Sequence, residues 1–126
     1  MIFGVGVDLC SVSRIARAIA NRRFIERVFS SEERAYAEAS GNPALHYSSS
    51  FAAKEAFAKA GGWGLARTGM SSVWVSRGNG RPELLLSGQA KELLPNRPYR
   101  IHLSLSHDGD MAVAVVILEV FDDPLL

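Results

Sequence analysis

A segment dominated by alanine, residues 45–60, restricts the fold of this chain more than any other stretch. Alanine is the strongest helix former, and the glycines at positions 61, 62 and 64 end a helix abruptly, so the segment predicts one helix that stops near residue 60. Phe51, Phe57 and Ala58 can face a core from this helix. With 126 residues, 48% of them hydrophobic, the chain is too short for a second catalytic domain, so we expect residues 1–126 to form a single domain.

The first residues of the chain predict a strand. Residues 2–9 are rich in Val and Ile and contain Gly4 and Gly6, a pattern typical of a buried strand that another backbone or a ligand approaches closely. Asp8 is expected at the end of this strand, directly before the start of a helix.

Two hairpins are expected in the second half of the chain. Residues 73–86 predict one that turns at the Gly-Asn-Gly sequence 78–80, and residues 101–118 predict another that turns at 108–110. Residues 87–94 between them predict a short helix.

Shorter helices are expected between the first strand and the alanine-rich helix. Ser11 or Ser13 can cap the first of them, and Ser30 with Glu33 forms a capping box for another. Residues 24–29, between the two, predict only a short apolar turn. Strands at the start, middle and end of the chain, with helices clustered between them, predict an α+β fold.

Charge and cysteine content exclude several classes of protein. The chain has 14 Lys and Arg against 13 Asp and Glu, so its net charge of +1 argues against wholesale electrostatic binding to nucleic acid. Cys10, the single cysteine, cannot form an internal disulfide or a cysteine metal cluster, which favours a reducing cytoplasm. The longest apolar run, residues 111–118, is far shorter than the roughly 20 residues of a membrane helix, and the N-terminus has no basic leader, so we expect neither a membrane span nor a signal peptide.

Two carboxylates and two lysines could carry chemistry. Asp8, between a strand and a helix, could cap that helix or hold a metal ion. Glu55 could simply pair with Lys59 four residues later on a solvated helix face, or it could belong to a site. Lys54 lies on a different side of that helix from Glu55, so the two are not a simple surface pair, and two adjacent charges inside an alanine-rich segment are unusual. The residues alone leave these alternatives open.

A turn and a glycine pair offer weaker candidates. His107 and Asp108 lie where a strand meets its turn, so Asp108 could merely form that turn with the next glycine. Gly61 and Gly62 could offer backbone amides to a phosphate, but they lack the P-loop pattern and first serve to end the helix.

The first 30 residues carry a local positive charge. Five arginines are opposed nearby only by Asp8 and Glu26, although the whole chain is close to neutral. Such a surface either binds an acidic partner or is merely solvated. The arginines are Arg14, Arg17, Arg22, Arg23 and Arg27.

Four sequence blocks become specific when they are taken together. They are Gly-Val-Gly-Val-Asp at 4–8 with Arg14-Ile15 downstream, Phe29-Ser30 before Glu32-Glu33, Phe-Ala-Ala-Lys-Glu-Ala at 51–56 with Lys59-Ala60-Gly61, and Leu-Ser-Leu-Ser-His-Asp at 103–108 followed by Ala112-Val113-Ala114. In order and spacing, over nearly the whole chain, these blocks resemble the holo-acyl-carrier-protein synthase family. Each block alone is modest, but the combination is highly specific.

The resemblance implies an α+β fold in which an antiparallel sheet packs against helices. It also implies transfer of the 4′-phosphopantetheine arm of coenzyme A to a serine of apo-acyl carrier protein, in fatty acid biosynthesis, with release of adenosine 3′,5′-bisphosphate. Breaking the pyrophosphate requires a hard cation, and Asp8 and Glu55 match the family's Mg²⁺ ligands. Lys59 resembles the family's lysine near the pyrophosphate. The residues expected to contact coenzyme A are Lys54, Lys59, Gly61, Gly62 and His107.

The resemblance leaves the general base open. A metal-linked water or a carboxylate near Asp8 or Glu55 could take the proton of the carrier serine, and His107 or Asp108 is the alternative.

The resemblance also implies partners. The family docks an acidic carrier protein on the arginine-bearing helix, so Arg14 and then Arg22 and Arg23 are expected contacts. Members of this size form homotrimers with active sites between neighbouring subunits. One departure concerns Ser50, where many members have an arginine. A phosphate contact is then lost, moved to Arg67 or Arg81, or replaced by a hydroxyl hydrogen bond, which affects coenzyme A affinity more than reaction type.

Two other functions stay open at this point. One is a non-catalytic module that binds an acidic protein or RNA through the basic helix and needs no magnesium. The other is a different Mg²⁺-dependent nucleotide enzyme, which would cleave coenzyme A without a carrier protein.

Overall fold

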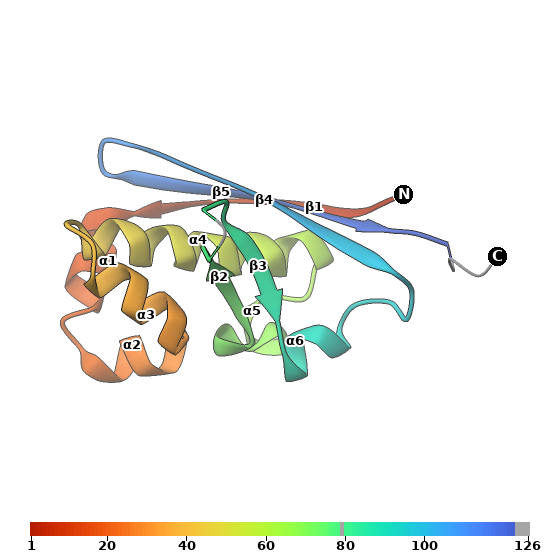
Figure 1. The fold of residues 1–126 in the computed structure, drawn as a ribbon, viewed down its shortest axis with the longest axis horizontal. Coiled ribbons are helices and arrows are strands. Elements are labelled where there is room, and N and C mark those ends of the chain that lie inside the picture. Colours follow the sequence, from red (N-terminus) through yellow and green to blue (C-terminus); the bar gives the residue numbers. More distant parts are fainter. Residues whose placement is uncertain (79, 123–126) are drawn as a thin grey trace.

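The computed structural model describes residues 1–78 and 80–122. A three-stranded antiparallel sheet lies along one side of a long helix, and the smaller elements gather on the other side of that helix (Figure 1). The fold is therefore α+β, as predicted. Asn79 of the expected first hairpin turn and residues 123–126 of the tail lie outside the described residues.

The sheet joins the two ends of the chain. β1 (Ile2–Ser11) pairs with β5 (Met111–Val120), and β5 pairs with β4 (Tyr99–Asp108). β4 and β5 form the predicted hairpin around a turn of Gly109 and Asp110. Gly109 has a φ of 55°, a left-handed conformation that glycine adopts without steric cost.

β1 packs directly on the backbone of the long helix α4 (Pro43–Gly61). A Cβ atom on Gly4 would lie 1.7 Å from the carbonyl oxygen of Ala60, and one on Gly6 would lie 1.9 Å from that of Ala56. No side chain fits at either position, so glycines on the strand and alanines on the helix allow a backbone contact. The predicted close approach is confirmed, and the approaching backbone is that of α4.

Only one face of β1 is buried, although the sequence predicted a buried strand. The side chains of Val5, Val7 and Leu9 are 60%, 53% and 64% exposed, whereas Asp8 and Cys10 are buried. The Val and Ile content of the strand had predicted burial of the whole strand. Within the described chain, α4 covers one face of the sheet and leaves the apolar outer face of β1 open to solvent.

Three short helices connect β1 to α4. Ser11 caps α1 (Val12–Ala18), and the predicted capping box of Ser30 and Glu33 begins α3 (Ser31–Glu38). The segment expected to be an apolar turn is instead the helix α2 (Arg22–Val28), because the side chain of Asn21 accepts a hydrogen bond from the N–H of Arg23 and caps it.

The alanine-rich helix is longer than predicted at its start. Asn42 is its N-cap and Pro43 its first residue, so the helix begins two residues before the expected Leu45. Proline suits this position, because the N–H that it lacks would find no partner within the helix anyway.

The second half of the chain contains small elements. After α5 (Leu65–Thr68) and the 3-10 helix η1 (Met70–Ser72), β2 (Val73–Ser76) pairs with β3 (Glu83–Leu86) as the predicted hairpin. α6 (Gly88–Glu92) lies within the expected short helix. None of the helices in residues 1–78 and 80–122 combines the length and apolar character that crossing a membrane requires.

Candidate active site

Asp8 of β1 and Lys59 of α4 form an ion pair where strand and helix meet. The Nζ atom of Lys59 lies 3.0 Å from Oδ1 of Asp8 and 3.2 Å from the carbonyl oxygen of Val7. The Asp8 side chain is buried, whereas that of Lys59 is 57% exposed. Gly4 and Gly6 lie on the same face of β1 as Asp8, so the contact that they allow also brings the carboxylate to the helix.

Glu55, one helical turn before Lys59, completes the group. Burial raises the pKa of the Glu55 carboxyl, and the negative charge of Asp8 raises it further, while the positive charges of Lys59 and Arg14 lower it. Two partly buried carboxylates that repel each other are suited to hold a divalent cation. Over the described ranges, no three His, Cys, Asp or Glu side chains gather as a metal cluster. Mg²⁺ needs only one or two carboxylates when waters and substrate phosphates complete its shell.

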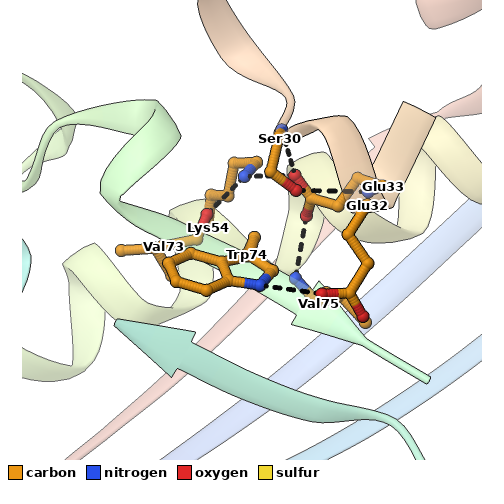
Figure 2. A network of polar contacts seen from close by, with 7 residues as sticks. All are labelled: Ser30, Glu32, Glu33, Lys54, Val73, Trp74 and Val75. Carbon is orange, nitrogen blue, oxygen red and sulfur yellow. Dashed lines mark hydrogen bonds and ion pairs between the residues drawn. The ribbon is translucent and has the colours of Figure 1, made fainter. Parts of the chain in front are cut away.

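Lys54 does not belong to this group. Its side chain is completely buried on the far side of α4, with Nζ 2.8 Å from Oε1 of Glu33 and a further hydrogen bond to the carbonyl oxygen of Val73 (Figure 2). The Glu33 carboxylate also accepts hydrogen bonds from the N–H groups of Ser30 and Val75. The expectation that Lys54 contacts coenzyme A does not fit this placement, because its ammonium group is enclosed by the protein's own acceptors.

His107 and Asp108 lie at the exposed end of β4. Since β5 separates β4 from β1, two strand spacings, about 10 Å, lie between His107 and the strand of Asp8. His107 pairs in register with Ala112 of β5, next to the turn of the hairpin. Within one chain, His107 and Asp108 are therefore apart from the two carboxylates.

Gly61 and Gly62 end α4 beside Lys59. Gly62 has a φ of 72°, and its N–H donates to the carbonyl oxygen of Lys59, while the N–H of Trp63 donates to that of Ala58. A Cβ atom on Gly61 would lie 2.4 Å from the Trp63 ring. The two glycines close the helix, and the Gly62 amide is engaged in that closure rather than free for a phosphate.

The predicted basic residues lie on the two helices that follow β1. Arg14 is exposed on α1, and Arg22 and Arg23 are exposed on α2. Arg22 lies 3.4 Å from Glu26 in an exposed pair of the kind that contributes little stability. The basic surface therefore begins only six positions after Asp8 along the chain.

Sequence analysis missed two carboxylates with important contacts. Glu33 was identified only as a capping residue, and its pairing with Lys54 was not foreseen, although a lysine inside an alanine-rich helix calls for an acidic partner. Asp110 was identified only as part of a turn, but it bonds to Ser11 and Ser13. No local pattern indicates that contact, because its two sides are 97 or more positions apart in the sequence.

The chain is similar to known proteins over nearly its whole length. A sequence profile of the 4′-phosphopantetheinyl transferase superfamily matches residues 4–116. The holo-[acyl-carrier-protein] synthase of Geotalea daltonii is 45% identical over 125 residues, which cover 94% of this chain and 99% of that protein. The synthase of the same name from Clostridium acetobutylicum is 38% identical over 124 residues, covering 96% and 100%.

Solved structures have the same fold. The holo-[acyl-carrier-protein] synthase of Neisseria meningitidis superposes with a TM-score of 0.85 at 30% identity, covering 94% of this chain and 99% of that one. A holo-(acyl-carrier-protein) synthase from Bacillus anthracis, solved in complex with coenzyme A (3′,5′-ADP), has a TM-score of 0.79 at 30% identity, covering 96% and 99%. On its sequence and its fold, the chain belongs to the 4′-phosphopantetheinyl transferase superfamily.

Proposed function

We propose that this protein transfers the 4′-phosphopantetheine arm of coenzyme A to a serine of an apo-acyl carrier protein and releases adenosine 3′,5′-bisphosphate. The observation that carries the proposal is the Asp8–Lys59 ion pair beside Glu55, in a chain of this superfamily. The names of the relatives support the same acceptor, and the Bacillus anthracis complex supports the same donor. Such a reaction serves fatty acid biosynthesis.

The reaction is a phosphoryl transfer. The serine oxygen bonds to the phosphorus that carries the pantetheine, the pyrophosphate P–O bond breaks, and the bisphosphate leaves with the electron pair of that bond. Catalysis of this kind depends on positive charge held near the phosphate oxygens. The exposed ammonium group of Lys59 can offset charge on the leaving group while its contact with Asp8 holds it in place.

Asp8 and Glu55 are the residues that would hold Mg²⁺. The fit rests on two adjacent carboxylates: burial raises the pKa of Glu55, and the negative charge of Asp8 raises it further. A magnesium ion bound there would neutralise phosphate oxygens during the transfer.

The proton of the carrier serine needs an acceptor. Asp8 and Glu55 lie together between β1 and α4, whereas His107 and Asp108 lie on the opposite edge strand of the same sheet. We therefore assign the proton to this carboxylate pair or to a water beside it. His107 and Gly61 stay expected contacts of coenzyme A, whereas Gly62 can contact it only through groups other than its engaged N–H.

Ser50 stands where many family members have an arginine, which limits the side chains that can bind a phosphate of coenzyme A. Ser50 lies within α4 and is only 5% exposed, so its hydroxyl is poorly placed to bind a ligand from solvent. Arg67 and Arg81 are both exposed. We expect one of these two arginines, rather than the hydroxyl, to supply a phosphate contact.

The open face of the sheet supports a homotrimer. Val5, Val7 and Leu9 are exposed side by side on β1, next to half-buried Val115 and Ile117 of β5. An apolar face of this kind is typical of a surface covered by another subunit. Light scattering under active conditions tests this, and a monomer of about 13.7 kDa would refute it.

The first experiment is intact-mass spectrometry of an apo-acyl carrier protein incubated with this protein and coenzyme A. We expect a gain of one phosphopantetheine, about 340 Da, with magnesium and none with a chelator. Asp8→Asn and Glu55→Gln should abolish the gain, while Glu92→Gln, an exposed charge change on α6, should leave it unchanged. A folded protein that modifies no carrier overturns the proposal.

The same experiment separates the two alternative functions. A binding module would leave the carrier unmodified with or without magnesium. A pyrophosphate-cleaving enzyme would consume coenzyme A when the carrier is left out, so that control should show intact coenzyme A.

A further inference from the structure

The start of α1 is capped by a residue from the other end of the chain. Oδ1 of Asp110 accepts a hydrogen bond from the N–H of Ser13 at 2.9 Å. Its Oδ2 accepts from the hydroxyls of Ser11 and Ser13 at 2.9 and 2.8 Å. The carbonyl oxygen of Asp110 accepts from the N–H of Val12 at 2.8 Å. One turn residue of the β4–β5 hairpin thus receives four hydrogen bonds from the residues that begin α1.

These contacts meet a specific need of α1. The first N–H groups of any helix have no partner within the helix. In α1, Asp110 accepts those of Val12 and Ser13, and the hydroxyl of Ser11 accepts that of Arg14 at 3.2 Å. The first turn of α1 contains no acidic residue, so Asp110 supplies the negative charge that a helix N-terminus favours.

Apart from this cap, α1 is held by its packing against α4 and β1. Ile15 is the one residue of α1 that is fully buried, since Arg14, Ala16 and Arg17 are exposed. The hydrogen bonds from Ser13 and Ser11 also lower the pKa of Asp110, so its carboxylate stays ionised well below neutral pH. The cap therefore helps to fix the orientation of this short helix.

We propose that Asp110 is a positioning residue for the carrier protein, because its cap on α1 holds Arg14 at a fixed place relative to Asp8. This inference rests on the proposed function. A carrier protein that docks on Arg14 must also present its serine at Asp8 and Glu55. A helix that moves freely at its start satisfies both contacts less often, so docking weakens.

A simple charge effect predicts the opposite sign. Asp110 is a negative charge near Arg14 and Arg17, so its removal makes the surface more attractive to an acidic carrier and lowers the KM for that carrier. Loss of the cap, in contrast, raises the KM for the carrier. Glu26→Gln is the matched control, because it removes one carboxylate charge from the same basic surface without touching the start of α1.

The experiment compares Asp110→Ala, Asp110→Asn and Glu26→Gln with the unaltered protein. Two quantities are measured: steady-state constants for carrier and coenzyme A, and amide hydrogen exchange at residues 12–14. For Asp110→Ala we expect the carrier KM to rise by up to about fivefold, the fold-change equivalent to the roughly 1 kcal/mol that an N-cap adds to helix stability. The KM for coenzyme A and kcat should stay within about twofold of their starting values. Amide exchange at residues 12–14 should become faster. Asp110→Asn, which keeps a cap acceptor, should restore most of the carrier KM, and Glu26→Gln should not raise it.

Every outcome of this experiment either supports or overturns the positioning role of Asp110. Faster exchange with an unchanged or lower carrier KM overturns the positioning role, because the helix start has then loosened without consequence for docking. Unchanged exchange overturns the cap itself. If Asp110→Ala does not fold, Ser13→Ala removes one donor and is judged by the same two measurements. A protein that transfers nothing to any carrier contradicts the proposed function instead, and the exchange measurement still tests the cap.

Discussion

The ammonium nitrogen of Lys54 lies 2.8 Å from Oε1 of Glu33, and both side chains are shut off from solvent. Burial lowers the pKa of Lys54, while the charge and hydrogen bond of Glu33 raise it. Figure 2 shows how the pair joins three elements: Glu33 on α3, Lys54 on α4, and the backbone of β2. Lys54 and Glu55 are consecutive residues, so the pair anchors one side of α4 while Glu55 takes part in the site with Asp8 on β1.

Removal of the Lys54 charge should destabilise the protein strongly. Lys54→Met leaves the Glu33 carboxylate buried without its cation, which typically costs about 3–5 kcal/mol of unfolding free energy. The double variant Lys54→Met/Glu33→Gln removes both charges and should cost less than the single one. Urea unfolding measures both. A double variant that is less stable than Lys54→Met would contradict this account of the pair.

A methyl group on Gly6 should disrupt the contact between β1 and α4. Gly6→Ala places a Cβ atom 1.9 Å from the Ala56 carbonyl oxygen, so strand and helix must separate, at a cost of at least about 1–3 kcal/mol. Gly41→Ala is the control, because a Cβ atom there has no described neighbour within 4 Å. Thermal unfolding should show a lower Tm for Gly6→Ala alone. Equal Tm values for the two variants would mean that the backbone contact is not tight.

Loss of the Lys59 ammonium group should slow the transfer more than it weakens binding. Lys59→Met should lower kcat by about 100-fold, the usual effect of removing one donor that stabilises charge in the transition state. Lys59→Met also leaves the buried Asp8 carboxylate without its cation beside Glu55, so Tm should fall as well. Lys59→Arg keeps the charge and should recover part of the rate. If Lys59→Met changed only the KM for coenzyme A, its role would be ground-state binding.

Reversal of one charge on α1 should affect the carrier protein selectively. Arg14→Glu should raise the carrier KM by on the order of tenfold and change the KM for coenzyme A much less, and added salt should weaken carrier binding in the unaltered protein. Lys91→Glu makes the same charge change on α6, outside the basic surface, and serves as the control. Equal effects of Arg14→Glu on both substrates would remove the docking assignment.

Tyr47 should lose its phenolic proton well above the usual pH range of tyrosine. The side chain of Tyr47 is buried and its hydroxyl donates to Glu38 at 2.8 Å, and together burial and this carboxylate raise the pKa of Tyr47 to about 12. The unfolded chain loses that proton near pH 10, so the contribution of Tyr47 to stability is complete below about pH 10 and is lost as the pH rises toward 12. Tyrosinate absorbance, compared with Tyr47→Phe, measures the late titration. A Tyr47→Phe difference spectrum that titrates near pH 10 would contradict it.

Local patterns in the sequence were sufficient for most elements. The alanine content and following glycines predicted α4, the Ser30–Glu33 spacing predicted the start of α3, and the alternation in the last third predicted the β4–β5 hairpin. Asp8, Glu55 and Lys59 were predicted as site residues because the blocks around them resemble one family, and the fold brings the three together. These features depend on neighbours a few positions apart, which the sequence lists directly.

Contacts between distant segments were decided only by the tertiary structure. The sequence predicted that Lys54 contacts coenzyme A, but in the fold its ammonium group pairs with Glu33, 21 positions away. Sequence left Lys59 a choice of partners, and packing gives it Asp8, 51 positions away. The cap on α1 comes from Asp110, and the exposure of Val7 follows from helices lying on only one face of the sheet in the described chain. Residue type and spacing determine which local structure forms, whereas the partner of a charged group depends on how those structures pack, and that packing is a property of the whole chain.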